Sequence, residues 1–413
     1  MKKINPVELF SKEIINYQVK TAYYGLTNYV NLDNAATTPP FKEVEKGVKN
    51  YLISYGSVHR GAGAKSKIST DIYEESRVVI KKFVNAPKND YVLFTSNTTG
   101  ALNSAAYFFS FLKGKVAVSS IEHSSSWLPW IKSEGIKKLN NEQVQEWELE
   151  KLNDKIQKLG GRQIIQYDID DKFEFDLKGL EKLLKNNEIK VVVVTASSNV
   201  TGYCPDLKKI GELAHKYGAY FLVDACQYIQ HNPLNMRAMG IDFLAASGHK
   251  FYAPYGGGFL IGPKKFFDKF LPHEIGGGNL PYITSTGEFL RYKNQLAHDP
   301  GTPNAVGAVA MAIALKKIEK IGLNNIKKYE HGLALKLFDY LNKNPKVKIF
   351  ITRKNLNTVI PFTIENRNSN EFAEKLNYGY GIGVRAGSFC VYQVIRRLLN
   401  PLKLALMKKF LPF

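Results

Sequence analysis

With 413 residues, 44% of them hydrophobic, the chain is long enough for two domains, since a single core stops growing near about 250–300 residues. Its three cysteines match no metal-ligand spacing and are too few for a disulfide framework, and no apolar run approaches the roughly 18 residues of a membrane span. The formal net charge of +20 comes from scattered lysines without an accompanying recognition helix or RNA-binding signature, so we expect a cytoplasmic protein with no nucleic-acid partner and no membrane association.

Short apolar runs rich in β-branched and aromatic residues alternate along the chain with segments of helical period. We expect strands at residues 91–95, 116–119, 191–195, 220–224 and 243–246. Helices are expected at residues 72–83, 98–112 and 207–217. Near-continuous apolar strands between amphipathic helices predict an α/β fold with a mainly parallel sheet that helices cover on both faces. In such a sheet, ligands bind beyond the carboxyl ends of the strands.

The pattern changes near residue 301. Before it, residues 137–190 are expected to form helices, with a charged surface over 142–158. After it, long helices are expected at 306–321 and 325–341, followed by a strand pair near 347–351 and 358–364. We therefore predict a large domain over residues 31–300 and a smaller C-terminal domain over 301–413. The N-terminal segment, residues 1–30, is expected to pack with the smaller domain.

Two polar side chains follow neighbouring apolar strands. Asp224 ends the strand at 220–224, and Lys250 follows the strand at 243–246 by way of Ser247-Gly248-His249. A lysine in a dry cleft loses its proton readily enough to form an imine with an aldehyde, and a carboxylate can pair with a pyridinium nitrogen. Each residue alone would be an ordinary loop residue, but together they predict a site for pyridoxal phosphate (PLP).

Other polar residues follow the remaining strands. Asn97-Thr98-Thr99 opens a helix whose first N–H groups could bind an anion, although plain N-capping explains the same pattern. His123 could stack on a flat ring and transfer protons, or be a surface histidine. Asn199 could be a turn former. Alternatively, Asn199 and Gln227 could reach a phenolic oxygen on the ring.

Cys390 lies in a glycine-containing loop, Gly383-Val384-Arg385-Ala386-Gly387-Ser388-Phe389-Cys390. A nearby arginine favours the thiolate, so this cysteine is a candidate nucleophile. A buried structural cysteine is the more frequent alternative, and it fits Cys226 at an apolar strand end.

A series of short motifs occurs along the chain in one order. They are Asp33-Asn34-Ala35-Ala36-Thr37-Thr38, Val58-His59-Arg60-Gly61, Asn97-Thr98-Thr99, Glu122-His123, Asp224-Ala225-Cys226-Gln227, Ser247-Gly248-His249-Lys250 and Arg385-Ala386-Gly387-Ser388-Phe389-Cys390. Together they resemble the class V aminotransferase-like PLP enzymes, and within these the cysteine desulfurase and selenocysteine lyase group. The form Arg-x-Gly-x-x-Cys is similar to the second subgroup, whose cysteine lies on a short ordered loop.

The resemblance, which covers roughly residues 25–395, implies PLP fold type I with a seven-stranded sheet. Lys250 would hold the cofactor aldehyde, Asp224 would pair with the pyridine nitrogen, and His123 would stack on the ring. The other implied cofactor contacts are Thr98, Thr99, Asn199, Gln227, Ser247, His249 and, from the partner subunit of a homodimer, Thr286 or Thr284. The implied substrate contacts are Ala35, Asn199 and Arg385, and no metal is expected.

The implied reaction converts L-cysteine to L-alanine. The freed amine of Lys250 would remove the α-proton, and the thiolate of Cys390 would take the sulfur as a persulfide. The persulfide would pass to a sulfur-acceptor protein, for example in iron–sulfur cluster assembly. Two alternatives stay open: another class V reaction, such as transamination, epimerisation or selenocysteine cleavage, or a PLP-fold protein without turnover.

The chain departs from the family after Cys390. Family enzymes carry an arginine there, in a segment reading like Arg-x-Ser, that binds the substrate α-carboxylate. The twenty-three residues after Cys390 contain no such motif, and Arg396 and Arg397 lie in a predicted helix and are not assigned the role. Losing the arginine that binds the α-carboxylate would reduce both the orientation and the affinity of the substrate. We therefore expect a shortened C-terminal end with impaired substrate binding.

Overall fold

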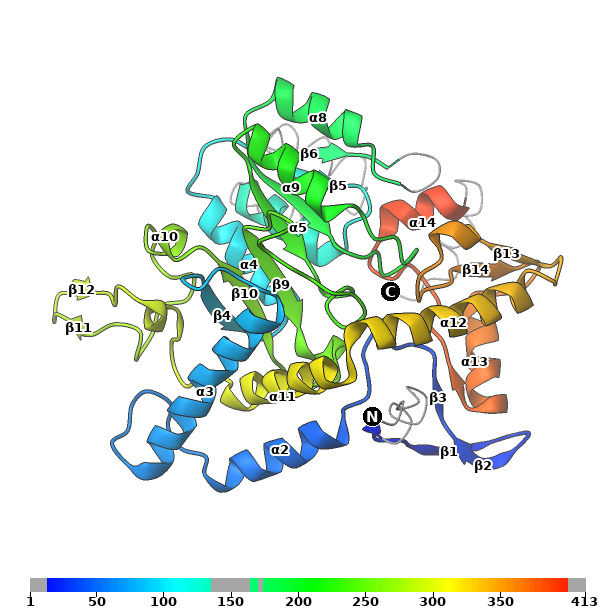
Figure 1. Ribbon diagram of the computed structural model, residues 1–413, viewed down its shortest axis with the longest axis horizontal. Helices are drawn as coiled ribbons and strands as arrows, with labels where there is room; N and C mark the ends of the chain where they lie inside the picture. The colour runs from blue at the N-terminus through cyan, green and yellow to red at the C-terminus, as the bar shows by residue number, and fades with distance from the viewer. Residues whose placement is uncertain (1–12, 135–163, 170–173, 400–413) are drawn as a thin grey trace.

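A computed structural model describes residues 13–134, 164–169 and 174–399 (Figure 1). The predicted helical surface at 142–158 and the last fourteen of the twenty-three residues after Cys390, 400–413, lie outside these residues. Among the described residues, no helix has both the length and the apolar character that a bilayer crossing requires.

A seven-stranded sheet forms the centre of the protein, with the strand order β4-β10-β9-β8-β7-β5-β6 (Figure 1). β10 is antiparallel to both of its neighbours, and the other pairings are parallel. The strands are β4 (Tyr91–Thr95), β5 (Lys115–Ser119), β6 (Ile164–Tyr167), β7 (Ile189–Thr195), β8 (Tyr220–Asp224), β9 (Phe243–Ser247) and β10 (Gly258–Gly262). The five strands expected at residues 91–95, 116–119, 191–195, 220–224 and 243–246 are all present in this sheet within two residues of their predicted ends.

The sheet is covered on both faces because its strands are apolar on both sides. Val192 and Val194 belong to one core cluster, whereas Val191 and Val193 belong to the other, as the two-residue period of a strand requires. The first face packs against α2 (Lys42–Ile53), α3 (Ala64–Phe83), α8 (Leu177–Asn186), α9 (Leu207–Lys216) and α11 (Ala305–Ile321). The second face packs against α4 (Thr98–Phe109), α5 (Ser124–Glu134) and α10 (Lys264–Phe267).

The region after α11 combines helices with short strands. It contains α12 (Leu323–Leu341), β13 (Val347–Ile349), β14 (Phe362–Ile364), α13 (Ser369–Tyr380), β15 (Ile382–Gly383) and α14 (Tyr392–Leu399). The chain start joins it, since β3 (Val30–Asn31) pairs with β15 and the hairpin of β1 (Gln18–Thr21) and β2 (Gly25–Asn28) lies against α13. α11 itself packs on α2 and α3, while the proposed domain boundary at residue 300 stays a prediction.

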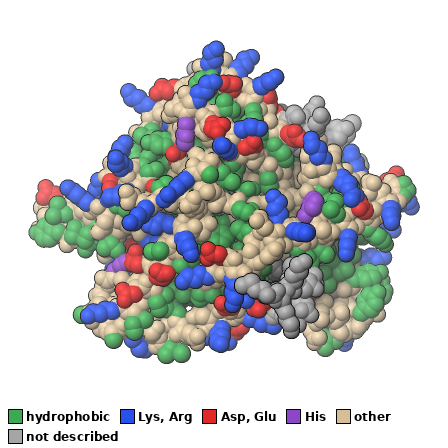
Figure 2. All heavy atoms as spheres, in the orientation of Figure 1, with side chains coloured by type: hydrophobic (Ala, Val, Ile, Leu, Met, Phe, Trp, Pro, Cys, Tyr) green, Lys and Arg blue, Asp and Glu red, His purple; other side chains and the backbone are tan. Residues whose placement is uncertain are grey.

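Two strands of the seven-stranded sheet differ from the expectation. The prediction of helices over residues 137–190 is confirmed at α8 but is wrong at residues 164–167, which pair with β5 as strand β6. β10 has no counterpart among the strands expected from sequence. Positive charge is dispersed, as Figure 2 shows: on the face drawn, lysine and arginine side chains alternate with acidic, apolar and neutral ones rather than forming one stripe.

Candidate active site

Asp224 and Ser247 end the parallel strands β8 and β9, so they lie at the same edge of the sheet. A short 3-10 turn, Gly248–Lys250, continues from β9 and places Lys250 beside this edge. The side chain of Lys250 is partly buried, and its Nζ donates a hydrogen bond to the Ala35 carbonyl at 2.6 Å. Gln227 donates its Nε2 to the same carbonyl. The loop before α2 therefore holds the lysine amine and the glutamine amide together.

The carboxylate of Asp224 is buried, with 4% of the residue exposed. Its Oδ2 accepts the Ser126 hydroxyl at 2.8 Å and its Oδ1 accepts the Cys226 backbone N–H at 3.0 Å. These donors fix the orientation of a carboxylate that no basic side chain contacts directly among the described residues. Such a carboxylate is suited to pairing with a cationic ring nitrogen.

His123 lies next to this carboxylate, immediately before α5. Its Nδ1 accepts the Ser125 backbone N–H at 3.1 Å. Burial lowers the pKa of His123, while Asp224 raises it and Lys250 lowers it. The imidazole is therefore neutral near pH 7, which suits stacking on a flat ring.

The residues predicted to bind phosphate gather at the start of α4. Thr98 Oγ1 contacts Cys226 Sγ at 3.1 Å, and Thr99 Oγ1 lies 2.8 Å from Ser125 Oγ. The hydroxyl of Ser247 is buried and has no hydrogen-bond partner among the described residues. A helix start with an unsatisfied buried hydroxyl beside it offers donors to an anion.

Two backbone features shape the same place. A Cβ added at Gly258 would lie 2.5 Å from the backbone of Asn97, so the strand and the start of α4 can approach closely only with glycine there. The carbonyl of His249 accepts the hydroxyls of Thr37 and Thr38 and the backbone N–H of Thr38. Burial lowers the pKa of the His249 imidazole. The lysine, the buried carboxylate, the neutral histidine and the anion-binding corner together fit PLP.

Glu122, the residue before His123, is the least expected ionisable group in the site. Its Oε1 accepts the Ser119 hydroxyl at 2.5 Å and the Thr195 backbone N–H at 2.6 Å, while its Oε2 is buried without a partner in the described part of the chain. Burial raises the pKa of Glu122 to about 8, and Asp224 adds to the effect. No sequence pattern could have revealed this, because it arises from the packing of the side chain between the ends of β5 and β7.

We predict that Glu122→Gln makes stability less dependent on pH. Glu122 ionises near 4.5 when unfolded and at about 8 when folded, so the folded state binds an extra proton between these values. Stability therefore falls as pH rises through this window, by on the order of a few kcal/mol. Urea unfolding at several pH values should show a flatter profile for Glu122→Gln, and the exposed Glu188→Gln should match the wild type. Parallel profiles for the wild type and Glu122→Gln would show that the raised pKa of Glu122 does not cause the pH dependence of stability.

The loop that carries Cys390 reaches the same edge of the sheet from the C-terminal region. The Cys390 carbonyl accepts both the backbone N–H and the hydroxyl of Ser124, each at 2.8 Å. The neighbouring Phe389 carbonyl accepts Asn199 Nδ2 at 2.9 Å. Cys390 is exposed, whereas Cys204 and Cys226 are partly buried. Sequence reasoning missed Ser124, since nothing near it points to a residue 266 positions away.

Two arginines of this region, Arg385 and Arg397, form ion pairs. Arg385 forms a bidentate ion pair with Asp33, with N–O distances of 3.0–3.1 Å. Arg397 pairs with Asp168 at 2.6 Å and so fastens α14 to the end of β6. The guanidinium of Arg385 is thereby bound to a residue two positions before Ala35, whose carbonyl holds Lys250.

Thr286 lies apart from these residues in this chain. It is exposed in the hairpin of β11 (Tyr282–Ile283) and β12 (Phe289–Leu290), where its hydroxyl contacts Thr284 at 2.9 Å. The hairpin projects from the body of the protein (Figure 1). A contact between Thr286 and the site of a second subunit stays a prediction.

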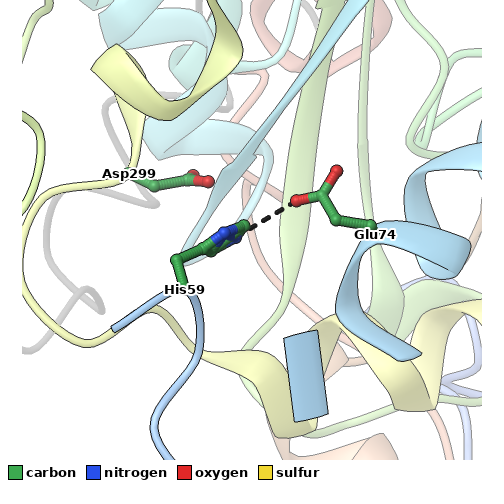
Figure 3. A group of neighbouring side chains, drawn as sticks. All are labelled: His59, Glu74 and Asp299. Carbon is green, nitrogen blue, oxygen red and sulfur yellow. Dashed lines mark ion pairs between the residues drawn. The ribbon is translucent and has the colours of Figure 1, made fainter. Parts of the chain in front are cut away.

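The motif around His59 contributes a second group of polar side chains, His59, Glu74 and Asp299 (Figure 3). His59 Nε2 lies 3.2 Å from Glu74 Oε1. The buried guanidinium of Arg77 pairs with both carboxylates. Since this guanidinium already supplies the positive charge that a metal ion would bring, we interpret the group as an ion-pair network bracing α3. Arg60 donates to the Asp299 carbonyl and extends the network.

Comparisons with known proteins agree with this arrangement. The class-V aminotransferase family model matches residues 30–159 and 150–405. A probable cysteine desulfurase of Pyrococcus abyssi is 33% identical over 383 residues, covering 89% of this chain and 86% of that protein. The apo cysteine desulfurase of Thermococcus onnurineus superposes with a TM-score of 0.77 at 31% identity, covering 90% of this chain and 87% of that one. The cysteine desulfurase CsdA of Escherichia coli, in its S-sulfonic acid form, superposes with a TM-score of 0.79 at 25% identity, covering 96% and 91%.

Proposed function

The chain belongs to the class-V aminotransferase family, and from this premise we propose that it is a PLP-dependent cysteine desulfurase. The predicted family and the predicted PLP fold type I are confirmed. The observation that carries the proposed activity is the placement of Cys390, whose loop is bonded to the residue following His123. A transaminase or epimerase of the same fold would not need a thiol at this point.

PLP, when bound, supplies an aldehyde that captures an amino acid and a ring that accepts electrons from its α-carbon. The chain provides the groups around it. Lys250 would hold the aldehyde, the buried carboxylate of Asp224 would keep the ring nitrogen protonated, and His123 would stack on the ring. Thr98, Thr99, Ser247 and His249 would bind the phosphate, with the first N–H groups of α4.

Lys250 also moves a proton. The Ala35 carbonyl holds the Nζ of Lys250 at the edge of the site, where this amine would be placed to accept the substrate α-proton when it is not bonded to the cofactor. The same amine can then return a proton to the product. Gln227 donates to the same carbonyl and so helps to hold the loop in position.

Cys390 accepts the sulfur. Its thiolate attacks the substrate Sγ, so that an S–S bond forms while the substrate Cβ–S bond breaks and the electron pair passes to the carbon side. Protonation at Cβ completes alanine. The balance is L-cysteine plus the Cys390 thiol giving L-alanine plus a Cys390 persulfide, with no external oxidant or reductant. Arg385 is our candidate for binding the substrate carboxylate. Its guanidinium would release the carboxylate of Asp33 and bind that of the substrate instead.

Partners and location follow as further parts of the proposal. The persulfide on an exposed cysteine suits transfer to a sulfur-acceptor protein, such as one serving iron–sulfur cluster assembly in the cytoplasm. A homodimer is supported by the β11–β12 hairpin, whose apolar side chains are exposed, with Tyr282 at 59% and Ile283 at 61%. In such a dimer, Thr286 would contribute to the phosphate site of the partner subunit.

The proposal is tested by giving the purified protein PLP and L-cysteine and measuring alanine and sulfide in the presence of a thiol reductant. We expect a visible absorption band that shifts on adding cysteine, followed by equal amounts of alanine and sulfide. Pyruvate and ammonia, or a keto acid formed without sulfide, would instead identify another class V reaction. A stable band with no product from any amino acid would identify an idle protein.

A further inference from the structure

The loop ending at Cys390 has an unusual backbone. Phe389 and Cys390 both adopt left-handed conformations, with φ of 53° and 56°, and Gly387 has a φ of 113°. Two consecutive residues with a Cβ in this region are unfavourable, so the surrounding structure must hold them there. The loop would otherwise relax and move the thiol.

Two residues that follow strands of the seven-stranded sheet, Ser124 and Asn199, bind this segment. Ser124 donates twice to the Cys390 carbonyl, from its backbone N–H and from its hydroxyl, at 2.8 Å each. Asn199 donates its Nδ2 to the Phe389 carbonyl at 2.9 Å. The two left-handed residues are thus each bonded through their carbonyl oxygen.

Ser124 is well placed to align the thiol with the rest of the site. It is the first residue of α5 and directly follows His123. The Cys390 carbonyl therefore lies at the N-terminus of this helix, where unpaired N–H groups and the helix dipole favour a hydrogen-bond acceptor. Two residues later, Ser126 donates to Asp224. One helix start therefore contacts both the loop of Cys390 and the buried carboxylate of Asp224.

The other end of the loop is anchored separately. Val391 and the apolar face of α14 pack into a cluster with Ile121 and Val200, and Arg397 pairs with Asp168. Loosening the carbonyl contacts should therefore free the residues just before Val391 without detaching α14.

We propose that Ser124 and Asn199 are positioning residues that clamp the two peptide carbonyls before and at Cys390 and so fix its thiol for sulfur transfer. This inference rests on the proposed function for its role in catalysis, but not for the clamp itself. The clamp acts after substrate capture, since neither residue's bond to the loop involves the lysine. Its loss should lower kcat for desulfuration with little change in KM.

The decisive variant is Ser124→Pro, which removes both donors yet keeps a residue favoured at the first position of a helix. Ser124→Ala removes one donor, and Ser124→Thr should restore it. Ser133→Ala, at the far end of α5, is the matched control, because its hydroxyl bonds only within the helix. Far-ultraviolet circular dichroism and the unshifted cofactor band verify that each variant is folded and loaded.

Hydrogen exchange of the peptide spanning residues 386–391 provides a readout that needs no catalysis. In Ser124→Pro we expect exchange there to accelerate by about tenfold, the effect of losing one or two ordinary hydrogen bonds. We expect persulfide formation on Cys390, followed by mass spectrometry, to slow by about the same factor, while the cysteine-induced band shift keeps its amplitude and half-saturation. Ser133→Ala should change neither rate.

Unchanged exchange in Ser124→Pro would overturn the clamp, and so would faster exchange with a wild-type rate of persulfide formation. If the wild type formed no persulfide while Ser124→Pro still exchanged faster, the desulfurase proposal would fail and the structural clamp would stand. The two failures are therefore distinguishable.

Discussion

Replacing Lys250 by alanine is expected to abolish covalent capture of the cofactor and to reduce turnover of cysteine by at least about 10³-fold, because in the proposed mechanism one amine serves both as the attachment point and as the base. The hydrogen bond from Nζ to the Ala35 carbonyl shows that the amine is directed into the site rather than into solvent. Borohydride reduction followed by peptide mass spectrometry should find the reduced adduct at residue 250 in the wild type and nowhere in Lys250→Ala.

Two further variants make the Lys250 experiment specific. Lys250→Arg keeps the positive charge but cannot form the covalent bond, so it should be as inactive as Lys250→Ala. Lys208→Ala, on the exposed face of α9, should behave as the wild type. An adduct that survives at another lysine in Lys250→Ala would show that the assignment of the site is wrong.

Replacing Cys390 by alanine is expected to lower alanine and sulfide production by at least about 10²-fold while leaving cofactor binding intact. The structure separates Cys390 from the other two cysteines. Burial raises the pKa of Cys226 to about 11 and also raises that of Cys204, so both favour the unreactive thiol, whereas Cys390 is exposed. The cysteine-induced shift of the visible band should remain in Cys390→Ala, because we assign cofactor attachment and ring pairing to Lys250 and Asp224 and not to Cys390.

Cys204→Ser is the matched control for this variant, since serine can keep the contact with Asn357. It should retain full turnover. Full turnover by Cys390→Ala would exclude the persulfide mechanism and favour a class V reaction in which the cysteine plays no part. Loss of the band shift in Cys390→Ala would instead indicate that the loop is required to bind the substrate.

Local sequence patterns predicted much of the fold. The runs that form β4, β5, β7, β8 and β9 are apolar on both faces, and this pattern is what a buried parallel strand requires. The helix predicted at β6 is wrong and β10 was missed, because pairing with β5 and with β4 and β9 decided their conformation. The polar residues at strand ends could be grouped from the sequence, since parallel strands bring their carboxyl ends to one edge of the sheet.

The sequence by itself determined the chemistry that this protein can offer: a lysine and an aspartate at neighbouring strand ends, a histidine nearby and a cysteine on a glycine-containing loop. The tertiary structure alone decided which groups orient them. Ala35 reaches Lys250 across 215 positions and Ser124 reaches Cys390 across 266. Such contacts join backbone carbonyls to distant donors, and a carbonyl has the same chemistry in every residue, so no residue pattern can mark it. The proton held by Glu122 likewise follows from burial, which only packing between strands creates.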